Sequence, residues 1–160
     1  MPNSHSPSLR SKVARALSAF ALMVLPLAET VAQSPRAMSE DEMKASGGKQ
    51  LSGDAIKKLL VGNTSYVLFI KAMGSVQAGT TVAVYHRDER NRTTQTGRGQ
   101  GRATFWWLEG NLYCAEQRAA NVGNQCYALW DLAGTIYLCP RPSRECLATA
   151  RYLPGNTENL

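Results

Sequence analysis

From Thr64 onward the chain alternates short runs of β-branched and aromatic residues with polar turn sequences, at spacings of about 8 to 12 residues. This pattern predicts β-strands at residues 64–71, 80–87, 92–96, 103–108, 111–117, 125–131, 134–139 and 147–152. The later connections are short, which favours antiparallel neighbours because a parallel crossover needs a dozen or more residues. About eight meandering strands must close or fold over to protect their edges. We therefore expect a mainly β fold, either a small lipocalin-like barrel or a two-sheet sandwich.

Two short helical segments precede these strands. In the first, Ser39 occupies the N-cap position and Glu42 the third helical position, which is the pattern of a capping box. In the second, Ser52 is the cap, and Ile56 and Leu60 share one face. A helix of about two turns is not stable alone. The second helix must therefore pack against the sheet.

The N-terminal residues have the layout of a secretory signal peptide. Basic residues precede an uncharged run at 16–28, and this run of about 13 residues is too short to cross a bilayer core of roughly 30 Å. We expect cleavage after Ala32, or alternatively after Ala28, and a periplasmic or secreted product. The predicted organisation is a signal peptide at 1–32, a flexible or helical segment at 33–50, a single β domain at 51–153 and a disordered tail at 154–160.

Four cysteines in an exported chain usually form two disulfides. No C-x-x-C pair is present, so a structural zinc site is disfavoured, and no cofactor is expected. Three connectivities remain open for four cysteines. We favour the pairing of chain neighbours, because each pair then closes a short loop. These pairs are Cys114 with Cys126 and Cys139 with Cys146.

The sequence FWWLEGNLYC at 105–114 places adjacent tryptophans on one predicted strand. Side chains alternate between the two faces of a strand, so Trp106 and Trp107 point in opposite directions. One of them fills the core, while the other packs under a helix or lines a surface groove. Both are candidate ligand contacts, but aromatic residues recur on the following strands, which favours a role in the core.

A basic stretch surrounds the glycine-rich sequence at 97–101. We interpret it first as a solvated, solubilising loop; the functional alternative is a mobile hairpin that contacts an anionic partner such as lipid, glycan or an envelope protein. Nucleic acid is disfavoured by export, and a phosphate-binding loop by the absence of a following helix. The candidate partner-binding residues of this stretch are Arg90, Arg92, Arg98 and Arg102.

Catalytic residues are scarce once the signal peptide is removed. His86 is then the one remaining histidine, and its neighbours Arg87 and Asp88 indicate a surface or rim position. There is no G-x-S-x-G motif, and pairing consumes the cysteines. We therefore expect a non-catalytic binding or interaction module, with a secreted inhibitor of a hydrolase such as lysozyme as the alternative.

Three segments carry a resemblance to a known group of proteins: LSGDAIKKLLVGNT at 51–64, FWWLEGNLYC at 105–114 and QCY at 125–127. In this order they resemble small exported proteins of alphaproteobacteria that are grouped as a domain of unknown function. The resemblance implies a periplasmic β domain without an assigned activity, so no functional residue is carried over. The doubled tryptophan and the basic hairpin depart from that pattern.

Overall fold

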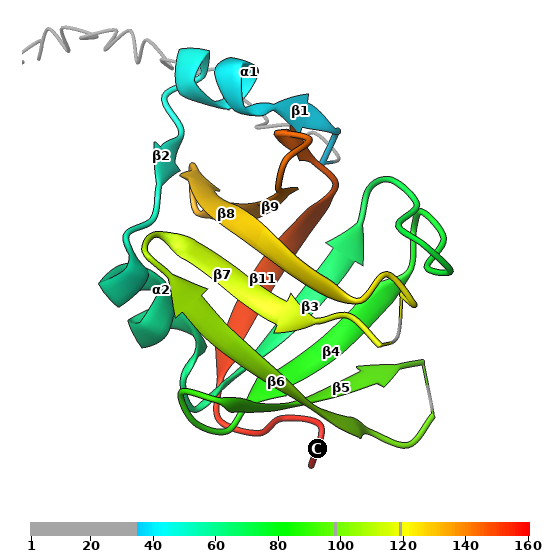
Figure 1. The fold of residues 1–160 in the computed structure, drawn as a ribbon. Helices are drawn as coiled ribbons and strands as arrows, with labels where there is room; N and C mark the ends of the chain where they lie inside the picture. The colour runs from blue at the N-terminus through cyan, green and yellow to red at the C-terminus, as the bar shows by residue number, and fades with distance from the viewer. Residues whose placement is uncertain (1–34, 98, 119) are drawn as a thin grey trace, which may run out of the picture. The chain divides into compact units, whose positions relative to one another are not determined.

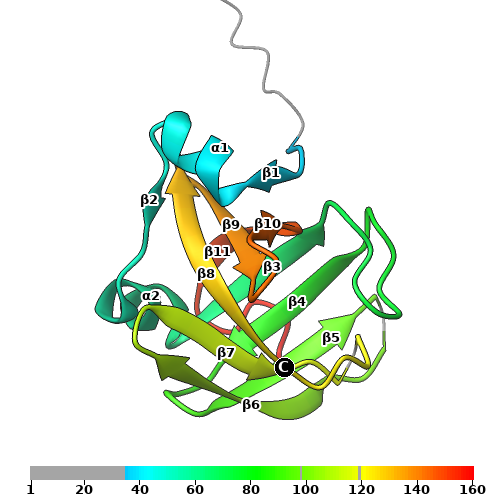
Figure 2. The same ribbon diagram turned by 45° about the horizontal axis from the view of Figure 1, so that its top comes forward.

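The computed structural model describes residues 35–97, 99–118 and 120–160; the predicted signal peptide, its cleavage sites and Arg98 lie outside these residues. The described chain forms an antiparallel barrel of eight strands, which confirms the barrel rather than the sandwich (Figures 1 and 2). All eight predicted strands are present. They are β3 (Asn63–Phe69), β4 (Thr81–His86), β5 (Asn91–Thr96), β6 (Arg102–Glu109), β7 (Leu112–Glu116), β8 (Asn124–Leu132), β9 (Thr135–Pro140) and β11 (Ala148–Pro154).

The barrel is closed by the last strand rather than by the meander alone. From β3 to β9 each strand pairs with the next one in sequence, and β11 then inserts between β9 and β3. Ala150 of β11 has Val67 of β3 as its partner on one side and Ile136 of β9 on the other. Closure leaves no free edge among these strands.

Helix α2 (Gly53–Leu60) covers one end of the barrel. Ser52 caps it by accepting from the Ala55 amide at 3.3 Å, and Ile56 and Leu60 are buried in the main core. The Gly53 amide donates to Asn111 Oδ1 at 2.9 Å, which fixes the helix to the turn between β6 and β7. The connections β3–β4, β5–β6 and β7–β8 gather at the other end, which we call the mouth (Figure 1).

The segment predicted as flexible or helical forms β1 (Met38–Ser39), α1 (Glu40–Ala45) and β2 (Lys49–Gln50). The capping box is present, because the Glu42 amide donates to Ser39 Oγ at 3.2 Å and the Ser39 amide donates to the Glu42 carboxylate at 2.7 Å. Strand β1 pairs with β10 (Glu145–Cys146), and β2 pairs with β8. The segment is thus attached to the barrel at two places.

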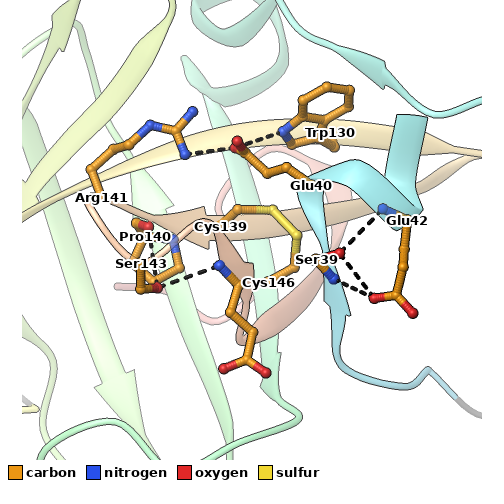
Figure 3. Close-up of a disulfide and its surroundings, with 10 residues drawn as sticks. Ser39, Glu40, Glu42, Trp130, Cys139, Pro140, Arg141, Ser143 and Cys146 are labelled. Atoms are coloured by element: carbon orange, nitrogen blue, oxygen red, sulfur yellow. Dashed lines mark hydrogen bonds and ion pairs between the residues drawn. A yellow bond between two sulfur atoms is a disulfide. The ribbon is translucent and has the colours of Figure 1, made fainter. Parts of the chain in front are cut away.

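Helix α1 packs on the barrel through two buried side chains, Met43 and Glu40. Figure 3 shows the contacts of Glu40. Its Oε1 accepts hydrogen bonds from Trp130 Nε1 at 3.1 Å and from Arg141 at 2.6 Å. The Cys139–Cys146 disulfide lies in the same apolar cluster as Trp130. We call Glu40, Trp130 and Arg141 the N-terminal clasp.

Both favoured disulfides are confirmed. Cys114 and Cys126 are directly opposite each other on β7 and β8 and are bonded, as are Cys139 and Cys146. No cysteine of the described chain remains free. Each disulfide therefore closes a short loop between cysteines that are neighbours along the chain.

The last residues, predicted as a disordered tail, are instead held against β3. The Gly155 amide donates to the carbonyl of Gly62 at 3.0 Å, and the Thr157 amide donates to Thr64 Oγ1 at 3.1 Å. The Tyr66 hydroxyl lies 2.8 Å from Thr157 Oγ1. Hydrogen bonds to residues far away in the sequence thus hold this segment in place. The polar sequence of the segment itself does not reveal these partners.

Neither helix of the described residues is long and apolar enough to span a bilayer.

Candidate functional site

The barrel interior has a polar side and an apolar side. Neighbouring strands β5, β6 and β7 contribute the buried or cavity-lining residues Arg92, Thr94, Thr104, Trp106 and Tyr113. Strands β3, β4 and β9 contribute Val67, Phe69, Val82, Val84 and Leu138. A wholly apolar interior would suffice for stability. The polar side is therefore the feature that needs explanation.

The two candidate tryptophans lie on opposite faces, as their alternation predicts. Trp106 is 2% exposed and belongs to the main core, and its Nε1 donates to the carbonyl oxygen of Asp88 at 2.8 Å. Trp107 is half-buried on the outer face, where its Nε1 donates to Glu109 at 2.8 Å. Neither tryptophan lines the cavities described below.

Arg92 lies inside the barrel and is only 4% exposed, in contrast to its predicted place on a solvated hairpin. Its Nε donates to Thr104 Oγ1 at 2.9 Å and one terminal nitrogen donates to the Tyr113 hydroxyl at 2.6 Å. The other terminal nitrogen donates to the carbonyl oxygen of Glu116. All these partners are neutral. Among the described residues no carboxylate forms an ion pair with Arg92.

His86 is also buried, so the predicted rim position is wrong. Its side chain is 1% exposed, and its ring lies 5.5 Å from that of Trp106 in an edge-to-face arrangement. The physical reason is the strand alternation, which puts His86 on the interior face together with Val82 and Val84. Burial, and secondly the charge of Arg92, lower the pKa of His86 to about 3. The imidazole is therefore neutral at pH 7.

The hydrogen bonds between these residues assign their protons. Arginine only donates, so the Tyr113 hydroxyl accepts from Arg92. Burial raises the pKa of Tyr113, which keeps its own proton available for His86 Nε2 at 3.1 Å. The proton of the neutral imidazole then resides on Nδ1. This atom has no hydrogen-bond partner among the described residues.

An inner cavity of about 40 Å³ lies between the polar and the apolar sides. Arg92, His86 and Thr94 all line it. Thr94 Oγ1, like His86 Nδ1, is buried without a hydrogen-bond partner in the described chain. A buried polar atom left unpaired costs about 1–3 kcal/mol. The cavity wall thus holds unused hydrogen-bonding capacity beside a buried positive charge.

A second cavity of about 730 Å³ opens at the mouth. Val76, Arg92, Thr94 and Gln117 line both cavities, so they form the boundary between them. Arg102 and Arg118 lie further out on the exposed wall of this outer cavity. Arg118 is 3.1 Å from a carboxylate oxygen of Glu116, and this contact neutralises the one acidic residue that lines the outer cavity. The path from solvent to Arg92 is therefore polar and carries excess positive charge.

The predicted basic hairpin does not form one surface. Strand β5 runs the length of the barrel wall, so Arg90, which precedes it, lies at the opposite end from Arg102. Both are exposed. Arg92, between them, points inward. Among the described candidate residues of this stretch, Arg92 lines both cavities and Arg102 lines only the outer one. Arg90 lines neither cavity.

The side chains of Glu109, Cys114 and Cys126 present three potential metal-ligand atoms within 4.8 Å of one another. The two sulfur atoms are bonded to each other, however. A disulfide has no thiolate to offer a metal ion. This group is therefore not a metal site in the oxidised protein.

No family model, no curated protein and no solved structure matches this chain. The resemblance to exported alphaproteobacterial proteins stays a prediction.

Proposed function

We propose that the protein is an exported, non-catalytic binding module that takes a small anion inside its barrel, beside Arg92. The observation that carries the proposal is the buried guanidinium without a carboxylate partner in the described chain. Removing a charge from water costs several kcal/mol, and neutral hydrogen-bond partners recover only part of that cost. An anion that enters from the mouth supplies the missing negative charge.

A binding role also agrees with the lowered pKa of His86 and with the pairing of all four cysteines. A general base works best when its pKa is near the working pH. The pKa of His86 is lowered to about 3, so this residue neither carries a charge nor accepts a proton readily at pH 7. The four cysteines are paired and cannot act as nucleophiles. Export is supported by the same two disulfides, which are typical of proteins from oxidising compartments.

The proposal is tested by thermal unfolding and calorimetric titration of the oxidised protein. The probes are acetate, propionate and inorganic phosphate at constant ionic strength, with propionamide as an uncharged control. A ligand that binds the native state raises Tm in a concentration-dependent way, and we expect this for at least one of the anions. Arg92→Met removes the effect. Arg90→Met removes the same charge at an exposed position outside both cavities and retains it. Absence of binding for every anion refutes the proposal.

A further inference from the structure

The inner cavity has two chemically different walls. The buried cation and the two unpaired polar atoms of its wall belong to Arg92, His86 and Thr94 on β4 and β5. Other polar side chains also line it, and two of them are used within the fold: Ser65 Oγ donates to the carbonyl of Val84, and the Tyr127 hydroxyl donates to the sulfur of Met73. Across the barrel, β3, β9 and β11 contribute the hydrocarbon side chains of Val67, Phe69, Leu138 and Ala148, together with Ser65 and Tyr152. A ligand that satisfies both walls must itself be amphipathic. An inorganic anion would leave oxygen atoms facing side chains that cannot donate to them.

We infer that the ligand is a short-chain aliphatic monocarboxylate, held with its carboxylate at Arg92 and its hydrocarbon chain against Val67, Val82 and Leu138. The inference rests on the proposed function and adds the chemical class of the ligand.

The charge and hydrogen-bonding capacity of the polar wall specify a single carboxylate. A guanidinium has five N–H donors in a planar fork that matches a carboxylate. Three hydrogen bonds from Arg92 are used within the barrel, which leaves two donors. The Nδ1–H of His86 and the hydroxyl of Thr94 add two more. One buried cation balances one negative charge, whereas a phosphate dianion would leave a charge unpaired.

The size of the cavity limits the length of the chain. About 10–15 Å³ is needed to hold one water molecule, so a cavity of about 40 Å³ accommodates roughly three such groups. Met73, Val76 and Ala120 line the cavity on the side of the mouth connections. The Tyr127 hydroxyl donates to the sulfur of Met73 at 3.3 Å, which fixes one of these connections. Arg92 and Thr94 also line the outer cavity, so the carboxylate lies at the boundary between the two cavities and only the alkyl chain occupies the inner one. The two alkyl carbons of propionate or the three of butyrate fit this space, and longer chains must displace the mouth connections.

The experiment is a calorimetric titration of the oxidised protein with acetate, propionate, butyrate, octanoate and inorganic phosphate. Each buried methylene improves affinity by about fourfold. We expect that gain from acetate to butyrate, weaker binding of octanoate and much weaker binding of phosphate. Arg92→Met lowers the affinity for propionate by roughly tenfold to a hundredfold, the loss expected for hydrogen bonds to a charged group. Arg90→Met leaves it unchanged.

A second variant tests the apolar wall without touching the cation. Val82→Ala removes two methyl-sized groups from the cavity lining and shifts the preferred chain length upward by one or two carbons. Equal binding of phosphate and all carboxylates overturns this inference and leaves the proposed function in place. Binding of propionamide as tightly as propionate, or binding of no anion at all, overturns both.

Discussion

Two arginines lie beside buried aromatic residues, but only Arg141 forms an ion pair with a carboxylate of the described chain. Arg141, in the N-terminal clasp, forms an ion pair with Glu40 at 2.6 Å beside the indole of Trp130. Arg92, in the barrel, has a tyrosine, a threonine and a backbone carbonyl as partners. Arg92 is nevertheless the more deeply buried of the two.

The comparison shows what an arginine with a purely structural role looks like in this protein. At the clasp, a buried carboxylate arrives with the segment that needs anchoring, so charge and packing are balanced together. In the barrel no carboxylate of the described chain forms an ion pair with the cation, and a cavity remains next to it. The first arrangement contains its own counter-charge, and the second contains none among the described residues, which is the basis of the proposed anion site.

The largest expected effect comes from removing the carboxylate of the N-terminal clasp. Glu40→Ala leaves Arg141 and Trp130 Nε1 without their acceptor and lowers the local stability of α1 by about 2–3 kcal/mol. The loss is detected by hydrogen exchange at the Ser46 and Gly48 amides, which donate to carbonyl oxygens of the α1 segment. Exchange there should become about 30- to 150-fold faster.

Asp41→Ala is the matched control in the same helix. Asp41 is exposed in the first turn, and its loss removes only a favourable interaction with the helix dipole, worth about 0.5 kcal/mol. Equal effects of the two substitutions would mean that the clasp does not hold α1.

The second effect uses His86 as a reporter of the unbalanced cation. Burial and the charge of Arg92 lower the pKa of His86 from 6.5 to about 3. Below pH 6.5 the imidazole of the unfolded chain is protonated while that of the folded chain is still neutral. The free energy of unfolding is therefore unaffected by the titration of His86 above pH 6.5 and decreases steadily as the pH falls from 6.5 towards 3. Urea unfolding should show a loss of about 1.5–2 kcal/mol between pH 6.5 and pH 5 that is absent from His86→Gln. Parallel pH profiles for the two proteins would contradict the burial of a neutral imidazole.

The strands and disulfides could be predicted because their signals are local. Turn residues and alternation mark all eight strands, and short spacings favour the observed cysteine pairs. The interior position of His86 could also have been found, since it alternates with Val82 and Val84, but its charged neighbours suggested the rim. Arg92 is different. Its strand, NRTTQT, has no apolar alternation, and Tyr113 meets the guanidinium only because β5, β6 and β7 are paired side by side. The candidate site therefore depends on tertiary structure.

A smaller effect is expected from removing the unbalanced cation. Arg92→Met replaces a buried charge by an apolar chain of similar length, and the hydroxyl groups of Thr104 and Tyr113 can reorient. We expect the free energy of unfolding in the absence of ligand to rise by about 1 kcal/mol, because removal of an imperfectly paired buried charge is often stabilising. Denaturant unfolding at pH 7 measures this change. A loss of more than about 2 kcal/mol would make Arg92 a structural residue like Arg141.

The smallest effect concerns the outer cavity, where charge is exposed and screened. Arg118→Gln breaks an ion pair with Glu116 in which the arginine side chain is largely solvent-exposed, so the unfolding free energy should change by less than about 0.5 kcal/mol. The substitution also leaves the Glu116 carboxylate unpaired in the wall of the outer cavity. An incoming anion is then repelled, so the association rate of propionate should fall by about twofold to threefold at low salt, and the difference should vanish at high salt. Rapid-mixing kinetics at two ionic strengths measure this. A salt-independent change would mean that Arg118 contacts the bound ligand directly and that the site extends beyond Arg92 into the mouth.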